Sequence, residues 1–404
     1  MTAVAVLEEP RLDRMQRDRM TRLHKAMSDR GVGALVLLGN SNVSYATGTS
    51  WPLADQGRAN VERPVAVVTA EDENPYLFTP LPELLDPDLD LPEDHVHGPV
   101  YLEFDEGAES FVRALVELVP GDRGIAIDEL PGSMRRALQR VLPAVTPVSA
   151  DDVIDPAKII KTPDELGFLR RTLEITERAI APVQAALAPG EHQTELTAQF
   201  LRAAFELGAD SNILDSIWQV MPARLSDAPW TTHGGIACPL ITTERILREG
   251  DVLWVDTSVS CRGFASDFGR TWIVGTEPTA RQQDQFRTWR EMMDAVLSVT
   301  RAGATGADLT RAARAIGRSD RRPWMEHFYL AHGLGVDAAE APLIGTDLGD
   351  SYDERQVLAA GMVLVLEPLV WDDGAGGYRA EEVIAVTDDG YLSLTDYPYD
   401  PYVD

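Results

Sequence analysis

Five residues whose side chains can bind metal ions stand beside short apolar segments, where a rigid strand would hold them. They are Asp256, Asp267, His332, Glu367 and Glu381. Asp256 comes directly after the apolar run 252–255, and Asp267 follows eleven residues later, beyond a predicted turn. A hairpin of this length would bring the two carboxylates side by side. His332 is followed by glycines at 333 and 335, which permit a close approach of another backbone segment.

Carboxylates gathered at strand ends repel one another and are costly to bury unless a cation compensates their charge. Four carboxylates and one imidazole would suit two divalent ions that share bridging oxygens. Such a pair of ions lowers the pKa of a shared water, which can then attack a carbonyl carbon, and it stabilises the developing oxyanion. The alternative is that each acid lies on the surface next to a strand, since the chain holds 65 Asp and Glu residues. Spacing alone does not decide between the two.

Alternating helices and strands are predicted for the first part of the chain. The predicted strands are 34–39, 64–68, 76–78 and 124–127, and the predicted helices are 12–30 and 111–118. A turn is expected over 40–45, and the stretch 79–100, rich in Pro, Asp and Glu, is expected to be a loop. This pattern is typical of an α/β domain.

A helix start marks the boundary between two domains. Thr162 is placed to cap the helix, Pro163 takes the first helical position, and Glu165 completes a capping box. We therefore expect one domain over 1–156 and a second over 157–404. In the second domain, helices are predicted at 163–187, 194–207 and within 281–316, and strands at 252–255, 264–266, 271–274, 362–366 and 383–386. Two helices followed by strands occur twice, which indicates two similar halves.

The composition excludes several classes of partner. The chain has 404 residues and a formal net charge of −29, so it repels nucleic-acid phosphates and anionic lipid surfaces. It has no run of ~20 apolar residues that could span a membrane, and its first 18 residues lack the apolar core of a signal peptide. Its two cysteines, Cys238 and Cys261, exclude a disulfide framework and a thiolate zinc cluster. We expect a soluble cytoplasmic protein that binds neither nucleic acid nor membranes.

The motifs around the five residues, taken in order, resemble those of the pita-bread metallohydrolase family. This family includes Xaa-Pro dipeptidase, aminopeptidase P, methionine aminopeptidase and creatinase. The matching segments are 250–256, 266–271, 332–335, 367–368 and 379–382. The resemblance extends over about 160–398, and the segment 42–48 is similar to the amino-terminal domain of creatinases and prolidases. It implies an α/β fold with a creatinase-like amino-terminal domain, followed by a pita-bread domain with pseudo-twofold halves.

The resemblance also implies a centre with two divalent ions of manganese, cobalt, iron or zinc. In this assignment Asp256 would be a bidentate ligand of one metal ion. Asp267 and Glu381 would bridge both ions, and His332 and Glu367 would bind the second. The last two residues would also belong to the catalytic group.

Three further residues receive roles from the resemblance and from their setting. Arg379 matches an arginine that, in prolidase-like relatives, orients the site or binds a substrate carboxylate. His233 matches the upstream catalytic histidine of the family, although its spacing of 23 residues from Asp256 is longer than usual. The alternative for His233 is a plain loop histidine. Trp230 is a candidate for a wall of the substrate pocket, with a core position as the alternative.

One position departs from the family pattern. Prolidases and aminopeptidases P carry a second histidine seven residues after the ligand histidine, and here that position is Ala339. The missing imidazole would contact the substrate or stabilise the tetrahedral intermediate. His327 is a candidate to replace it, and the alternative is a helix-terminal or loop histidine.

The favoured function is metal-dependent hydrolysis of an amide or C–N bond in a small substrate, by default a dipeptide that ends in proline. Ala339 supports an alternative, a non-peptidase enzyme on the same scaffold. Examples are a creatinase-like C–N hydrolase and a lyase that cleaves dimethylsulfoniopropionate. A third interpretation is a non-catalytic binding module, which would have no need for five metal-seeking groups. The resemblance also implies a homodimer.

Overall fold

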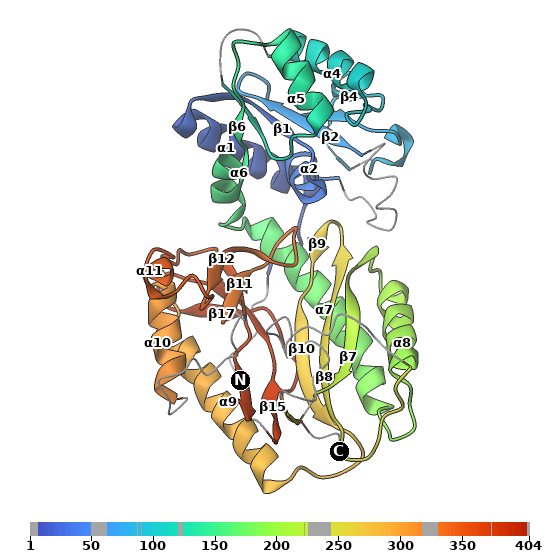
Figure 1. Cartoon of the computed structure of the whole chain (residues 1–404), viewed down its shortest axis with the longest axis vertical. Helices are drawn as coiled ribbons and strands as arrows, with labels where there is room; N and C mark the ends of the chain where they lie inside the picture. The colour runs from blue at the N-terminus through green and yellow to red at the C-terminus, as the bar shows by residue number, and fades with distance from the viewer. Residues whose placement is uncertain are drawn as a thin grey trace. The chain divides into compact units, whose positions relative to one another are not determined.

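The computed structural model of the chain describes residues 7–49, 63–86, 88–89, 91–119, 124–221, 223–224, 244–316, 330–372 and 374–401 (Figure 1). The chain forms two compact units. One comprises Glu8–Lys158 and Thr162–Glu165, and the other comprises Met1–Leu7, Ile159–Lys161 and Leu166–Asp404. The domain boundary expected after residue 156 stays a prediction. None of the helices in the described ranges combines the length and the apolar character that a membrane span requires.

The first unit is built around a six-stranded mixed sheet with the strand order β4-β3-β2-β1-β5-β6. Its strands are β1 (Val32–Leu37), β2 (Val65–Thr69), β3 (Tyr76–Phe78), β4 (Val96–His97), β5 (Gly124–Ile127) and β6 (Val148–Ser149). Its helices are α1 (Leu12–Arg30), α2 (Asn40–Thr47), α4 (Asp105–Leu118), α5 (Gly132–Val141) and α6 (Asp151–Lys158), with short 3-10 turns η1 (Pro82–Leu84) and η2 (Glu93–His95). The central strands β1 and β2 are buried along their whole length, so they form the core of this unit.

Three local predictions for this unit are wrong. The segment 40–45 is not a turn but part of helix α2, and the strand expected at 34–39 lies at 32–37. The supposed loop 79–100 contains η1, η2 and strand β4. Helix α2 forms because the carboxylate of Asp128 accepts the backbone N–H groups of Leu38 and Gly39, at 2.8 and 2.9 Å, directly before the helix. This partner lies far along the chain, so local sequence could not reveal it.

The second unit contains two sheets of unequal size and a short hairpin. One sheet has the order β10-β8-β7, with β9 paired to β8, and the other has the order β12-β11-β13-β16-β17. The first contains β7 (Ser211–Val220), β8 (Val252–Cys261), β9 (Phe264–Ala265) and β10 (Phe268–Ile273). The second contains β11 (Ala331–Gly333), β12 (Glu340–Ile344), β13 (Val363–Leu366), β16 (Glu382–Val386) and β17 (Tyr391–Ser393), and the hairpin is formed by β14 (Leu369–Asp372) and β15 (Gly376–Arg379).

Each half of the second unit begins with a pair of helices. The first pair is α7 (Pro163–Ala185) and α8 (Gln193–Glu206), and the second pair is α9 (Ala280–Val299) and α10 (Gly306–Ile316), followed by the short α11 (Asp350–Asp353). Helix α8 packs beside β7, while α9 and α10 pack beside the strands of the second half (Figure 1). The order of two helices followed by strands therefore occurs twice, as the sequence predicts.

The capping box predicted at the start of α7 is present. The backbone N–H of Glu165 donates to Thr162 Oγ1 at 3.1 Å, and the N–H of Thr162 donates to Glu165 Oε2 at 2.8 Å. Two otherwise unpaired donors at the helix start are thus satisfied reciprocally. This contact fixes where α7 begins.

Strand β8 is longer than expected, and Asp256 lies within it rather than at its end. The strand does not stop at Val255 but continues to Cys261. Polar residues hide this extension from a search for apolar runs, yet they are buried and paired. The hydroxyl of Ser258, for example, donates to the carbonyl of Ser266.

Strand β8 separates two apolar cores. Trp254 belongs to a core shared with α9 and the second sheet, and Val255 belongs to the core under α7 and α8. Side chains alternate along a strand, so Asp256 lies on the same side as Trp254. The first predicted ligand therefore faces the second half of the unit.

A buried ion pair holds the loop that follows β11. Lys161 Nζ lies 2.6 Å from Glu340 Oε2, and the two side chains are only 3% and 5% exposed. The other oxygen of Glu340 accepts the backbone N–H of Asp337. A Cβ on Gly335 would lie 2.5 Å from this carboxylate and would displace it, so glycine keeps the ion pair in place. The loop 334–339 is thus shaped around a buried charge.

Removing one member of this pair is expected to be costly. Lys161→Met leaves Glu340 buried without its cation, so the free energy of unfolding should fall by ~3–5 kcal/mol. The double variant Lys161→Met/Glu340→Leu should recover part of that loss. Urea denaturation measures both. The matched control is Lys25→Met, because Lys25 pairs with Asp29 on the surface and its loss should cost under ~1 kcal/mol. Equal losses in Lys25→Met and Lys161→Met would contradict the prediction.

Candidate metal centre

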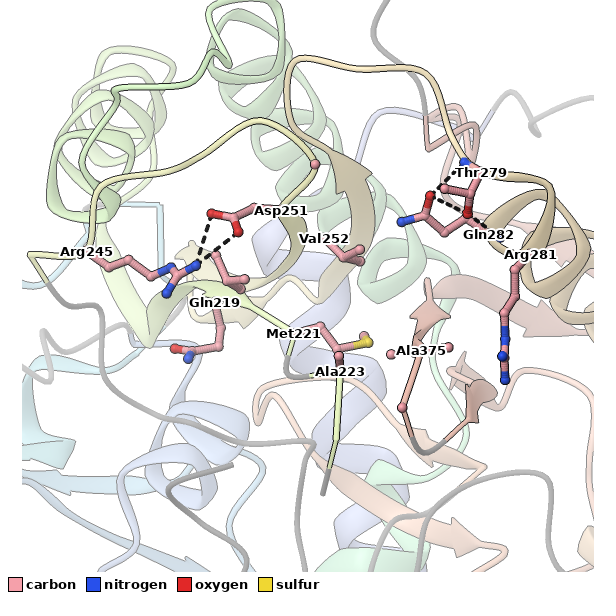
Figure 2. Close-up of a pocket in the computed structure, with 14 residues that line it drawn as sticks. Gln219, Met221, Ala223, Arg245, Asp251, Val252, Thr279, Arg281, Gln282 and Ala375 are labelled. Atoms are coloured by element: carbon pink, nitrogen blue, oxygen red, sulfur yellow. Dashed lines mark hydrogen bonds and ion pairs between the residues drawn. The ribbon is translucent and has the colours of Figure 1, made fainter. Parts of the chain in front are cut away.

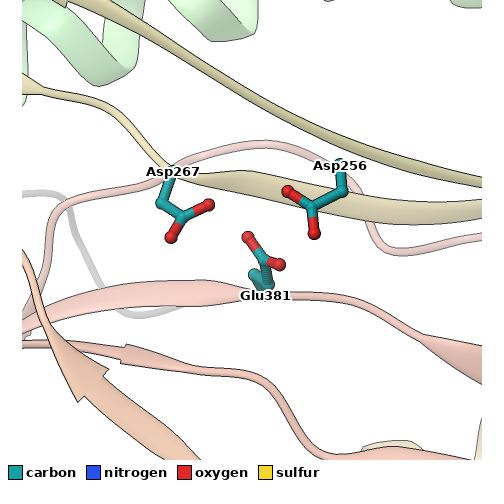
Figure 3. Close-up of side chains that lie close together, drawn as sticks. All are labelled: Asp256, Asp267 and Glu381. Atoms are coloured by element: carbon teal, nitrogen blue, oxygen red, sulfur yellow. The ribbon is translucent and has the colours of Figure 1, made fainter. Parts of the chain in front are cut away.

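Three carboxylates from separate strands of the second unit converge on one point (Figure 3). They belong to Asp256 in β8, Asp267 directly before β10, and Glu381 directly before β16. Each offers one oxygen, and these oxygens lie within 4.8 Å of one another. All three residues are less than a tenth exposed. The arrangement is therefore a buried acidic cluster rather than a set of surface acids.

Gly269 makes room for the third carboxylate. It lies opposite Asp256 in the ladder between β10 and β8. A Cβ at this position would come within 2.5 Å of Glu381 Oε1. The backbone N–H of Glu381 also donates to Gly269 O at 3.0 Å. Glycine in the middle of a strand often marks a close approach, and here the approaching group is a predicted ligand.

His332 and Glu367 complete the group of five. His332 lies in β11, which pairs with β13, and Glu367 follows the end of β13. The Nδ1 atom of His332 lies 2.8 Å from Gly333 O. A carbonyl oxygen only accepts hydrogen bonds, so Nδ1 carries the proton. The other ring nitrogen, Nε2, faces Asp267 Oδ2 at 3.2 Å and Glu367 Oε1 at 3.3 Å. All five predicted ligands are thus brought together.

Arg379 supplies positive charge to this cluster. Its guanidinium donates to Asp256 Oδ2 at 2.9 Å, contacts Glu381 Oε1 at 2.7 Å, and bonds to Glu367 Oε2. The group also lies over the ring of Trp254, 4.5 Å from its centre. These contacts orient three of the predicted ligands. Binding of a substrate carboxylate by Arg379 stays a prediction.

Burial and mutual repulsion shift the protonation of the cluster. Burial raises the pKa of Asp256 to about 7, with Arg379 opposing the rise and Asp267 adding to it. Burial and the charge of Asp267 raise the pKa of Glu381 well above its ordinary value. Burial lowers the pKa of His332, but hydrogen bonds to Asp267 and Glu367 outweigh it and raise that pKa to about 10.

These residues fit a divalent metal centre. Four carboxylates face one arginine and one imidazole, so two negative charges stay uncompensated when all four carboxylates are ionised, even with the imidazole protonated. Glu381 Oε2 is buried and has no hydrogen-bond partner among the described residues. The Nε2 atom of His332 faces two carboxylate oxygens, a position where a metal ion can take the place of a proton. Carboxylate oxygens with one imidazole suit manganese, cobalt, iron or zinc.

Several predicted residues lie outside the described residues. These are the candidate catalytic residues His233 and His327, the candidate pocket residue Trp230, and Cys238. Cys261 is described and lies buried as a free thiol. Ala339, which replaces the second family histidine, is exposed on the turn before β12.

Besides Arg379, two residues to which the sequence analysis assigned no role hold the ligands in place. Thr271 is one of them, because its hydroxyl donates to Arg379 O and accepts the N–H of Arg379. Gly269 is another, and it lies near the start of β10 opposite Asp256. Both residues fall within the segment 266–271 that resembles the family motif, but their contacts with residues 379 and 381 are not visible in the local sequence.

A cavity of about 700 Å³ lies against the start of β8, and none of the five predicted ligands lines it (Figure 2). Its polar side chains largely pair with one another. Arg245 contacts Asp251 at 3.0 Å, and Thr279 accepts the N–H of Gln282 at the start of α9. These contacts serve the fold, so we do not place the active site there.

A buried cluster of carboxylates and one imidazole, held between two similar α/β halves, defines the class as a metal-dependent enzyme. Residues 167–388 match the family described as metallopeptidase family M24, and residues 19–160 match the creatinase/prolidase N-terminal domain. The first match covers more than half of the chain. The protein therefore belongs to metallopeptidase family M24, and the predicted resemblance is confirmed.

The individual relatives of the chain include dipeptidases and a lyase. The chain is 24% identical to Xaa-Pro dipeptidase from Pyrococcus furiosus, over 94% of this chain and 98% of that protein. It is 25% identical to dimethylsulfoniopropionate lyase DddP from Roseovarius nubinhibens, over 99% and 90%. Among solved structures, the prolidase from Pyrococcus horikoshii matches with a TM-score of 0.75 and 23% identity, over 95% of this chain and all of that one.

A second solved structure extends the comparison. The X-Pro aminopeptidase from Thermotoga maritima matches with a TM-score of 0.74 and 20% identity, over 95% and 99% of the two chains. These likenesses confirm the predicted fold class, a pita-bread domain preceded by an amino-terminal α/β domain. Together with the family match, they confirm the prediction of a metallopeptidase that resembles Xaa-Pro dipeptidases.

The metal-free protein is expected to lose stability as the pH rises. The folded state binds more protons than the unfolded state between pH 3.8 and about 7 at Asp256, and between 6.5 and about 10 at His332. The free energy of unfolding therefore falls with rising pH in both intervals. Thermal melting in EDTA from pH 5 to pH 9 measures this fall.

Added Mn²⁺ should reverse this trend. Because it binds deprotonated ligands, the increase in melting temperature that it causes should grow over the same pH range. Asp256→Asn is the control, since it removes the titration of Asp256 and should make the lower part of the metal-free curve less steep. A wild-type melting temperature that rises with pH in EDTA would contradict the assignment.

Proposed function

We propose that the protein is a dinuclear metal-dependent hydrolase that cleaves an amide or C–N bond of a small substrate, by default a dipeptide ending in proline. The observation that carries this proposal is the buried group of five ligands, with one imidazole nitrogen facing two carboxylates at 3.2 and 3.3 Å. The resemblance to Xaa-Pro dipeptidases over nearly the whole chain supports the substrate class.

Each of the five ligands has a proposed role. Asp256 would hold one metal ion, and Asp267 and Glu381 would be shared between the two ions. His332 and Glu367 bind the second. When bound, the ions would activate a water molecule and polarise the scissile carbonyl. The metal is proposed to be manganese, with cobalt, iron and zinc as the other candidates.

The chain's own groups position the ligands and handle protons. The guanidinium of Arg379 orients three carboxylates and fixes their separation. The Nδ1–H bond to Gly333 O holds His332 in the tautomer that leaves Nε2 available to a metal ion. His233 is proposed to donate a proton or stabilise the oxyanion, and Arg379, His327 and Trp230 to contact the substrate. We also propose a homodimer in the cytoplasm.

Ala339 favours a second candidate, a non-peptidase reaction at the same site. This would be a creatinase-like C–N hydrolysis or cleavage of a dimethylsulfoniopropionate-type substrate. Ala339 carries no imidazole at the position where peptidases of the family have one, and it is exposed. The relative DddP matches 99% of the chain at 25% identity, which keeps the lyase reaction among the candidates.

The metal centre can be tested by removing one bridging ligand. Asp267→Asn takes away a carboxylate charge with little change of shape, so the variant should bind less than half of the wild-type metal and lose activity. Metal analysis after dialysis against buffered Mn²⁺ measures this. Asp251→Asn is the control, because Asp251 pairs with Arg245 and is no predicted ligand. Wild-type metal content in Asp267→Asn would contradict the assignment.

Substrate choice can be tested at Ala339. A site that lacks a hydrogen-bonding group gains little affinity for the substrates that would bond to that group, so it selects them only weakly. We therefore expect wild-type kcat/KM on Xaa-Pro dipeptides below ~10⁴ M⁻¹s⁻¹. Ala339→His should raise it, whereas Ala338→His, one residue away, should not. Creatine-like and sulfonium substrates belong in the same assay. Wild-type turnover of an Xaa-Pro dipeptide above this value would show that the imidazole is dispensable here.

A further inference from the structure

Arg270 in β10 is a buried cation that forms no ion pair with a described carboxylate. The residue is 1% exposed. Its guanidinium lies between aromatic rings, 4.7 Å from the ring centre of Phe268 and 4.6 Å from that of Tyr399. Burying a charge without a counter-ion costs several kcal/mol unless its donors are all satisfied. The groups that accept hydrogen bonds from Arg270 therefore indicate its role.

All four of its hydrogen bonds go to backbone carbonyls. Nη1 donates to Gly269 O at 2.8 Å and to Glu381 O at 2.7 Å. Nε donates to Pro398 O at 2.9 Å, and Nη2 donates to Tyr397 O at 2.9 Å. The guanidinium thus joins three stretches of backbone that are far apart in the sequence.

Two of these carbonyls belong to the segments that carry the bridging ligands. Glu381 is itself a proposed ligand, and Gly269 lies two residues after Asp267. The carbonyl of Gly269 also accepts the N–H of Glu381 at 3.0 Å. The guanidinium of Arg270 and one backbone hydrogen bond therefore fix the distance between the two segments that carry the bridging ligands.

The other two carbonyls connect the backbones of Gly269 and Glu381 to the C-terminal segment, residues 394–401. Its Pro401 O accepts the N–H of Ile273, at the end of the strand that carries Arg270, at 3.0 Å. The hydroxyl of Tyr378 donates to Tyr399 O. The C-terminal segment is thus tied to β10 and β15, and Arg270 connects it to the ligand backbones.

We propose that Arg270 is a positioning residue for the metal centre, which holds the backbones of Gly269 and Glu381 against the C-terminal segment so that both bridging carboxylates stay at ligand distance. This inference rests on the proposed dinuclear site. Carboxylates that repel one another move apart unless their backbones are fixed. Loss of an outer residue that orients ligands typically lowers metal affinity 10–100-fold.

The test compares two variants of the full-length protein with a matched control. Arg270→Met removes the charge and all four donors. Arg270→Lys keeps the charge, but a single ammonium group cannot reach carbonyls on both sides. The control is Arg170→Met, because Arg170 also donates to the C-terminal segment, at Leu394 O, yet contacts no carbonyl of a ligand segment. Titration calorimetry with Mn²⁺ gives the affinity, and melting in EDTA gives the stability of the metal-free fold.

The expected result is a loss of Mn²⁺ affinity of about tenfold or more in both Arg270 variants, because the backbones that carry two ligands are no longer held. Arg170→Met should lower the metal-free melting temperature and leave the affinity unchanged. A purely structural role would lower the melting temperature of the Arg270 variants without changing their affinity, and that result would overturn the proposal. If Arg270→Met does not fold, Arg270→Lys decides.

The outcomes separate this inference from the proposed function. Wild-type protein that binds Mn²⁺ while the Arg270 variants bind it equally well would overturn only the role of Arg270. Wild-type protein that binds no divalent ion at its five carboxylate and imidazole ligands would overturn both.

Discussion

Repulsion among buried carboxylates is the constraint on which the second unit depends. Four acidic side chains face one another with one guanidinium and one imidazole between them. These groups do not attract one another through apolar packing, so the strands that carry them must be held together by contacts elsewhere in the unit. The large cores on both sides of β8, the sheet hydrogen bonds and a few buried cations provide that force. The ligand cluster is a group of mutually repelling carboxylates inside a well-packed frame.

The frame acts on backbones more than on side chains. Arg379 contacts the carboxylates directly, whereas Arg270 and Thr271 contact carbonyl and amide groups of the segments that carry them. Gly269 contributes by having no side chain at all. Positioning through the backbone leaves the carboxylate oxygens available to ions. It also explains how an acidic cluster can coexist with the dense packing around Trp254.

Local patterns in the sequence predicted much of this centre. Apolar runs that stop at Glu367 and begin after Glu381 placed both acids at strand ends, and the turn before Asp267 predicted its approach to Asp256. The capping box of Thr162 and Glu165 predicted the start of α7 correctly. The helix at 40–47 was missed because its stabilising partner, Asp128, is far away in the chain. The role of Arg270 was missed for the same reason, since its acceptors lie up to 128 residues away.

The distribution of the ligands along the chain has a consequence for synthesis. Asp256 and Asp267 belong to one hairpin, whereas Glu381 stands 114 residues after Asp267. A chain emerging from the ribosome therefore exposes Asp256 and Asp267 long before Glu367 and Glu381 exist. Arg379 emerges only two residues ahead of Glu381. The guanidinium of Arg379 and the carboxylate of Glu381 are thus synthesised almost together. When the last acid joins the centre, a cation that partly balances the charge is already present.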